Sequence, residues 1–292
     1  MKPAQRSKTA EAVAAVRAVH LLYDRPVVFE DPFAIHLTSS SWRLIAKSRL
    51  LHWLVARTML RGFRPVHAQF LARARYAEEK LENAVGRGID QYVILGAGLD
   101  SFALRRRDLA TKLRVYELDH PATQLVKRGR LERRGVALPE NLELIPVDFE
   151  REALADALAR SSYHRERRGF FSLLGTVQYV PRDAVIGTLR SLAQVAAAGS
   201  ELVLTYNIPL NLVDASDRPA VERVLRFAAR RGEPFVSFFD PEAFPAEVCT
   251  LGYELLENCS PREQERRYFA GRTDDLRPLS SAYAAHFRVR GD

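Results

Sequence analysis

The stretch at residues 92–107, YVILGAGLDSFALRRR, decides the fold because an apolar run meets a Gly-Ala-Gly turn and then a helix-like segment. Gly96 and Gly98 lack a Cβ atom, so the backbone there can turn sharply and approach a ligand closely. A strand, a turn of this kind and a helix in succession predict an α/β unit that binds a cofactor.

The turn departs from two common phosphate-binding motifs. The dinucleotide motif GxGxxG would place a third glycine where this chain has Ser101, and no GK[ST] of a P-loop follows. Asp100 puts a carboxylate where a helix N-terminus would otherwise hold a pyrophosphate. The turn therefore disfavours a dinucleotide, although Asp100 can equally be a helix N-cap.

Short runs rich in Val, Ile, Leu and Tyr alternate with helical segments after residue 90. This alternation predicts a parallel sheet with helices on both faces, and apolar runs without alternation fit strands buried on both sides. Residues 209–235 are too long for a simple loop, and we expect a helical insertion there. The predicted strands are 91–96, 113–118, 142–147, 169–174, 201–208, 253–259 and 282–290.

Residues 1–90 have helical periodicity. We expect three helices there, over AEAVAAVRAVHLL, over WRLIAKSRLLHWLVARTMLRGF (residues 42–63) and over AQFLARARYAEEKLENAV. The predicted organisation is a helical N-terminal cap over 1–90 and an α/β core over 91–292.

Acidic residues lie at the ends of the second and third predicted strands. Glu117 lies 19 residues after Gly98, where a carboxylate can accept hydrogen bonds from both ribose hydroxyls. Asp148 can accept from an adenine amino group while Phe149 packs beside the ring, although Asp148 can also be an N-cap. Because open α/β sheets bind ligands at the carboxyl ends of their strands, this order predicts an adenosine-bearing cofactor.

Charge and composition narrow the classes of partner. The 292 residues carry a formal charge of +8, and no apolar run is long enough to span a bilayer. With no signal peptide we expect a cytoplasmic protein, and the Cys and His spacing predicts no metal site. No nucleic-acid motif accompanies the charge, so we expect no nucleic-acid partner.

One segment is basic throughout. Residues 32–77 contain no Asp or Glu. Such a segment favours an anionic substrate, an acidic carrier protein or peripheral contact with a membrane surface, and the alternative is a basic surface with no partner. Its basic residues are Arg43, Lys47, Arg49, Arg57, Arg61, Arg64, Arg73 and Arg75.

Several motifs resemble those of the leucine carboxyl methyltransferase family, in particular its bacterial branch. The resemblance implies a class I methyltransferase fold, a Rossmann-like sheet of seven mostly parallel strands with a helical N-terminal cap. It also implies S-adenosyl-L-methionine as the cofactor and methylation of carboxylates or hydroxyls of peptides and small molecules, including polyketide-type natural products. The motifs are SKTAEAVAAVRA, FEDPFA, QYVILGAGLDSFALR, VYELDHPATQLVKRGRL, LIPVDFE, LLGTVQYVPRDAV, GEPFVSFFDPEAF and RYFAGRTDDLRP.

The resemblance also implies roles for single residues. Arg75 matches the family arginine that pairs with the methionine carboxylate of the cofactor, and Arg17 resembles a second anchor. The alternative for Arg75 is a surface pair with a glutamate of the same helix. Many relatives carry a glutamate after the fourth strand, where this chain has LLGTVQYV (residues 173–180). The remaining implied contacts are Gly96, Gly98 and Asp100 on the methionine side, Glu117 and Asp119 at the ribose, and Asp148 and Phe149 at the adenine.

The reaction itself leaves few sequence clues. A carboxylate acceptor needs no general base, whereas an ordinary hydroxyl usually does, and no clear His–Asp pair is present. Arg73 is a candidate substrate contact, and Tyr179 and Tyr206 are candidates to orient a substrate or to pack in the core. We therefore expect an S-adenosylmethionine-dependent O-methyltransferase for a small or carrier-bound substrate with a carboxylate or acidic hydroxyl. The alternatives are an NAD(P)-dependent oxidoreductase and a cofactor-binding protein without turnover.

Overall fold

A computed structural model describes residues 8–55, 57, 63–149 and 151–291. Its centre is a seven-stranded sheet with the order β3-β2-β1-β4-β5-β7-β6. Strands β1 to β5 are parallel, and β7 runs antiparallel to both of its neighbours. The predicted sheet of seven mostly parallel strands is confirmed, and each predicted strand end lies within one residue of the observed one. The strands are β1 (Gln91–Leu95), β2 (Arg114–Asp119), β3 (Leu142–Pro146), β4 (Gly169–Leu173), β5 (Glu201–Asn207), β6 (Tyr253–Cys259) and β7 (Ala282–Val289).

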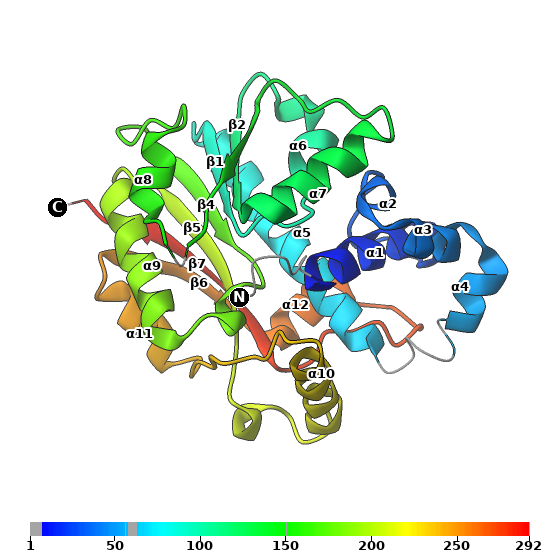
Figure 1. Cartoon of the computed structure of the whole chain (residues 1–292). Coiled ribbons are helices and arrows are strands. Elements are labelled where there is room, and N and C mark those ends of the chain that lie inside the picture. The colour runs from blue at the N-terminus through cyan, green and yellow to red at the C-terminus, as the bar shows by residue number, and fades with distance from the viewer. Residues whose placement is uncertain (1–7, 56, 58–62, 150, 292) are drawn as a thin grey trace.

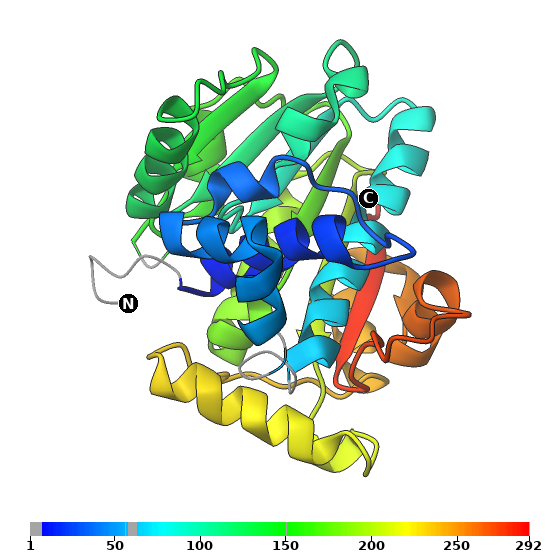
Figure 2. The same cartoon turned by 90° about the vertical axis from the view of Figure 1, so that its right-hand side faces the viewer.

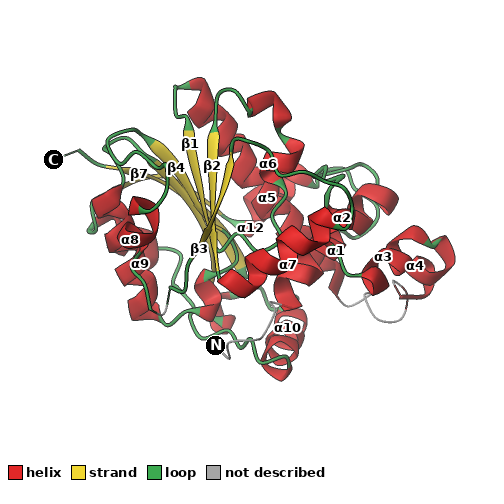
Figure 3. Cartoon of the chain, turned by 45° about the horizontal axis from the view of Figure 1, so that its top comes forward, coloured by secondary structure: helices red, strands yellow, loops and turns green. Residues whose placement is uncertain are grey.

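Helices cover both faces of the sheet (Figures 1 and 3). Along β1, Tyr92 and Ile94 pack toward α5 and α6, whereas Val93 and Leu95 belong to the cluster formed with α8, α9 and α11. Every residue of β1 is buried, as expected for a strand covered on both faces. The helices are α5 (Arg64–Gly86), α6 (Phe102–Arg105), α7 (Pro121–Glu132) and α12 (Pro261–Tyr268), and opposite them α8 (Leu154–Ala159), α9 (Arg182–Val195) and α11 (Ala243–Cys249).

Four N-terminal helices form a separate layer beside the sheet (Figure 2). They are α1 (Lys8–Tyr23), α2 (Ala34–Leu37), α3 (Ser40–Lys47) and α4 (Arg49–Val55). The single helix predicted over 42–63 is wrong, because the chain leaves the helical conformation at Ser48. The Ser48 hydroxyl then accepts the Leu51 N–H at 3.3 Å and begins α4. Residues 56 and 58–62, which include Arg61, lie outside the described part of the chain.

Helix α5 connects this layer to the sheet. Its first half packs Ala68, Leu71 and Ala72 against a cluster with Val28 and Phe269, and its second half packs on the sheet. The insertion after β5 contains α10 (Arg218–Arg230), which lies below the N-terminal helices in Figure 2. Among the described residues, short 3-10 turns lie at Arg107–Leu109, Val177–Tyr179 and Leu210–Leu212.

Candidate cofactor and substrate site

The glycine turn after β1 adopts a backbone that only glycine tolerates well. Gly96 and Gly98 have φ angles of +71° and +57°. A Cβ on Gly96 would lie 2.5 Å from Cγ2 of Thr176, in the segment after β4. The Gly98 N–H donates to Asp119 Oδ2 at 2.6 Å, which joins the turn to the end of β2. The turn is therefore held in shape by the neighbouring strand ends.

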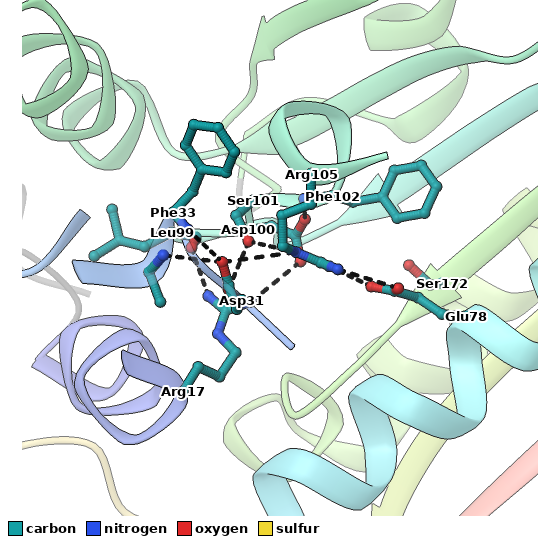
Figure 4. Close-up of polar contacts among 12 residues, drawn as sticks. Arg17, Asp31, Phe33, Glu78, Leu99, Asp100, Ser101, Phe102, Arg105 and Ser172 are labelled. Atoms are coloured by element: carbon teal, nitrogen blue, oxygen red, sulfur yellow. Dashed lines mark hydrogen bonds and ion pairs between the residues drawn. The ribbon is translucent and has the colours of Figure 1, made fainter. Parts of the chain in front are cut away.

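Arg17 of α1 is buried against this turn, and both of its terminal guanidinium nitrogens have partners there (Figure 4). One guanidinium nitrogen donates to the Leu99 carbonyl at 2.7 Å. The other lies 3.3 Å from Asp31 Oδ2 and 3.8 Å from Asp100 Oδ2. The predicted anchor Arg17 is thus at the cofactor turn, with two carboxylates around it.

Asp31 extends the same network to the helix after the turn. It is 1% exposed and accepts the Ser101 hydroxyl at 2.6 Å. Arg105 places its Nε 3.6 Å from Asp31 and also pairs with Glu78 of α5. Sequence reasoning did not single out Asp31, although it lies in the quoted FEDPFA motif. The network ties α1, the turn and α5 into one unit.

Asp100 is not the N-cap of α6, because that position is Ser101, but the Asp100 carboxylate still bonds to the start of the helix. Its Oδ1 accepts the Phe102 N–H at 2.6 Å, which satisfies a free donor at the first turn of α6. This hydrogen bond holds the carboxylate beside the turn, where it also faces Arg17. A negative charge fixed there suits a cationic ligand group better than a phosphate.

The two acids at the end of β2 differ in their surroundings. Glu117 is buried and pairs through Oε2 with Lys127, whereas its Oε1 is buried without a hydrogen-bond partner in the described chain. Burial raises the pKa of Glu117, and Lys127 partly offsets this effect. Asp119 accepts N–H groups of Gly98 and His120, and burial raises its pKa as well. An unpartnered carboxylate oxygen is an acceptor that a ligand hydroxyl can satisfy.

Asp148 and Phe149 follow β3 at the same edge of the sheet. The Phe149 side chain is 44% exposed, which is unusual for a phenylalanine ring. The Asp148 carboxylate lies 3.8 Å from Arg151 Nε. An exposed ring at the carboxyl edge of the sheet is available for packing against a flat ligand group.

Arg73 and Arg75 of α5 have different surroundings in the structure. Arg75 points outward, with its side chain 51% exposed, and its Nε lies 3.7 Å from Glu79 Oε1. That Arg75 contacts the cofactor stays a prediction, and in this structure its side chain does not line the cavity. Arg73 faces inward and lies against Gly175, where an added Cβ would be 2.0 Å from its Nη1.

Arg73 has no hydrogen bond or ion pair with any described residue. Its guanidinium lies 4.8 Å from the ring centre of Phe70. Burial lowers the pKa of Arg73 to about 10, so the group remains charged near neutral pH. A buried cation without a carboxylate is costly unless a ligand supplies the negative charge.

A cavity of about 190 Å³ opens beside Arg73 and Gly175. Its walls come from α1, α5, α10 and the carboxyl ends of β4 and β5, and most of the side chains are apolar. Tyr179 lies in the wall, edge-on to Phe235 with 5.2 Å between ring centres. Tyr206 also borders the cavity, but it is fully buried among Phe239, Phe244 and Tyr283, and its hydroxyl bonds to Asn258.

His67 of α5 is a cavity residue that sequence reasoning missed. Burial lowers the pKa of His67 to about 4, so the imidazole is neutral at physiological pH. It has no hydrogen bond to a described residue, and it shares the cavity side of α5 with Phe70 and Arg73. The spacing of these three residues, three apart along a helix, is the sequence signal that could have revealed it.

Comparison with known proteins identifies the family. A model of the leucine carboxyl methyltransferase family matches residues 10–193, more than half of the chain. The chain belongs to the leucine carboxyl methyltransferase family. It is 30% identical to YktD of Bacillus subtilis (strain 168), a candidate S-adenosyl-L-methionine-dependent methyltransferase, over 98% of this chain and 99% of that protein. A similarly described protein of Frankia alni, FRAAL3718, is 31% identical over 83% of this chain and 84% of its own length.

Solved structures share the fold at low sequence identity. A candidate methyltransferase from Thermobifida fusca superposes with a TM-score of 0.61 at 15% identity, covering 96% of this chain and 94% of that one. A DUF574 family protein from Streptomyces avermitilis gives a TM-score of 0.60 at 17% identity, covering 94% and 97%. The class I methyltransferase fold predicted from the sequence is confirmed.

Family membership decides between the cofactors considered from the sequence. The relatives are S-adenosyl-L-methionine-dependent methyltransferases by name, and this chain is one as well. The alternative of an NAD(P)-dependent oxidoreductase is therefore wrong. The residues present fit this cofactor. Arg73 is a cation in need of an anion, and Glu117 Oε1 is an acceptor in need of a donor.

Proposed function

We propose that this methyltransferase transfers the methyl group to an oxygen, either a carboxylate or an acidic hydroxyl, of a largely apolar small molecule. The observation behind the proposal is the apolar cavity that opens beside Arg73 and Gly175. Most of its wall is apolar, and Arg73, His67 and Tyr179 are among the polar side chains that line it. An acceptor with an apolar body and one polar end fits such a space.

For the cofactor, we assign Arg73 and Arg17 to the methionine carboxylate, in place of the pair Arg75 and Arg17 expected from the sequence. Arg17 lies near enough to Arg73 for its positive charge to contribute to the lowered pKa of Arg73. Two guanidinium groups without a shared carboxylate match a ligand that brings one. We assign Glu117 and Asp119 to the ribose hydroxyls and Asp148 and Phe149 to the adenine, as the resemblance implies.

The bound cofactor supplies a methyl group on a positively charged sulfur. The chain must therefore present a nucleophilic oxygen, exclude water and remove any proton that the oxygen carries. A carboxylate acceptor carries no proton near neutral pH, so positioning by the cavity walls is sufficient. An acidic hydroxyl loses its proton readily, and neutral His67 is an acceptor within the same cavity. Burial raises the pKa of Tyr179, so its phenol stays protonated and can donate to the acceptor oxygen.

Label transfer tests the proposal. The full chain is incubated with methyl-labelled S-adenosylmethionine and matched apolar acceptors that end in a carboxylic acid, a phenol, an amine or a thiol. We expect label on the acid or the phenol, and mild alkali releases it from an ester but not from an ether. Label on the amine or thiol alone would contradict O-methylation, as would a chain that binds S-adenosylhomocysteine but methylates none of the four.

A further inference from the structure

The short helices α3 and α4 expose large apolar side chains at an end of the molecule far from the sheet (Figure 1). Leu50 is 73% exposed, Leu44 63% and Trp53 54%. No residue of α4 is buried, although the helix is rich in leucine. Exposed large apolar residues gathered on two successive helices indicate a binding surface.

Basic residues lie between these apolar side chains. Lys47, Arg49 and Arg57 are exposed, and none of them forms an ion pair with a described residue. Arg57 instead lies over the Trp53 ring, 5.4 Å from its centre. The whole segment 32–77 lacks acidic residues, so its positive charge is not neutralised locally. We call Leu44, Lys47, Arg49, Leu50, Trp53 and Arg57 the α3–α4 surface.

The two helices are held to the rest of the chain from behind. His52 stacks on Tyr23 of α1 with 3.9 Å between ring centres, and the Tyr23 hydroxyl donates to the Ala46 carbonyl at 2.7 Å. Within α4, Leu50 and Trp53 are three residues apart, so they share the outward face, and Arg57 lies over the Trp53 ring. These contacts with α1 therefore fix the orientation of the outward face relative to the rest of the chain.

We propose that the α3–α4 surface docks this protein on an anionic lipid bilayer. Short amphipathic helices with leucine and tryptophan between cations lie in the interface of such bilayers, apolar side chains inward and cations at the headgroups. Each cation near an anionic lipid surface strengthens binding roughly fivefold. In the described chain no helix is long and apolar enough to cross a membrane, so the contact would be peripheral. Trp42 of α3 lines the cavity, which places the docked surface next to the substrate space.

Vesicle sedimentation of the full chain tests the proposal. Vesicles of phosphatidylcholine with an equal part of phosphatidylglycerol are compared with phosphatidylcholine alone, at low and high salt. We expect binding to the anionic vesicles that weakens with salt. Leu50→Gln with Trp53→Gln should lower the partition coefficient at least tenfold. Lys47→Gln with Arg49→Gln should lower it roughly 25-fold at low salt and less at high salt.

A matched control uses an exposed leucine elsewhere. Leu125 on α7 is 70% exposed, and Leu125→Gln should sediment as the unchanged protein does. All variants should retain their affinity for S-adenosylhomocysteine, which separates this proposal from the cofactor assignments. The proposal is overturned if the protein does not sediment with anionic vesicles or if the leucine–tryptophan variant binds as well as the unchanged protein. Retention on an acidic polypeptide that depends on Lys47 and Arg49 while vesicles are ignored would also overturn it, in favour of an acidic protein partner.

Discussion

Two arginines near the glycine turn, the buried Arg17 and the partly buried Arg73, differ in the partners that the chain gives them. Arg17 has a backbone carbonyl and two carboxylates within reach, and Asp31 links it onward to Arg105. Arg73 has no carboxylate partner in the described chain and lies against the bare backbone of Gly175. The protein satisfies the first cation itself and leaves the second for a ligand.

This difference indicates that the network around Arg17 stabilises the fold, whereas Arg73 serves ligand binding. A satisfied buried network fixes the relative position of α1, the turn and α5, so its loss should affect folding first. An unsatisfied cation contributes nothing to folding and should affect ligand binding first. The following changes test each side of the comparison.

The largest effect is expected at Asp31, the hub of the satisfied network. Asp31→Asn removes the charge that Arg17 and Arg105 share in the interior, and we expect the free energy of unfolding to fall by about 3 kcal/mol. Denaturant titration measures it. Asp108→Asn is the control, because Asp108 forms a surface pair with Arg106 and its loss should change stability by less than about 1 kcal/mol. Equal losses of stability in the Asp31 and Asp108 variants would contradict the special role of the buried network.

Gly175→Ala tests the place that Arg73 occupies. The added Cβ would meet Nη1 of Arg73 at 2.0 Å and Cζ at 2.5 Å, at a φ of +67° that alanine tolerates poorly. We expect a displaced guanidinium and roughly tenfold weaker binding of S-adenosylhomocysteine by calorimetry. Gly187→Ala on α9 meets no atom within 4 Å and should leave binding unchanged. Unaltered affinity in the Gly175 variant would contradict the assignment of Arg73.

His67 predicts a pH dependence of stability. Its pKa is lowered from 6.5 to about 4 in the folded chain, so the unfolded chain binds more protons between these values. Stability therefore falls as pH drops from 7 to 5, by roughly 1 kcal/mol after allowance for partial exposure. In His67→Gln the difference between denaturation at pH 7 and pH 5 should shrink by that amount. A variant that keeps the full acid sensitivity would show that other groups cause it.

The smallest effect is expected at Arg75. Arg75→Gln breaks only an exposed pair with Glu79, so stability should change by less than about 0.5 kcal/mol and cofactor affinity should not change. Calorimetry with S-adenosylhomocysteine checks the second point. A tenfold loss would restore Arg75 to the role that the family resemblance implied.

The sequence predicted the sheet well because its strands are short buried runs between glycines, prolines and helices. β1 and β4 are buried at every residue, and such runs have few alternative structures. The glycine turn and the acids after β2 and β3 were also predictable, since they follow strand ends that the topology gathers at one edge.

The hydrophobic pattern of α5 could not show which of Arg73 and Arg75 faces the cavity. They are two residues apart, so they point to different sides of α5, and the side that is buried changes along this helix. Ala68 and Leu71 face the cluster around Phe269, whereas Leu81 and Ala84 face the sheet. The pairing of Asp31 with Arg17 and Arg105 was equally invisible, because it joins segments far apart in the sequence.

Arg73→Gln, measured by both ligand binding and stability, tests the central claim most directly. The account predicts that affinity for S-adenosylhomocysteine falls roughly 100-fold or more, since a charged contact to the methionine carboxylate is lost. The free energy of unfolding should stay the same or rise, because an unpaired cation leaves the interior. A chain that loses several kcal/mol of stability and still binds S-adenosylhomocysteine normally would show that Arg73 serves the fold and not the cofactor.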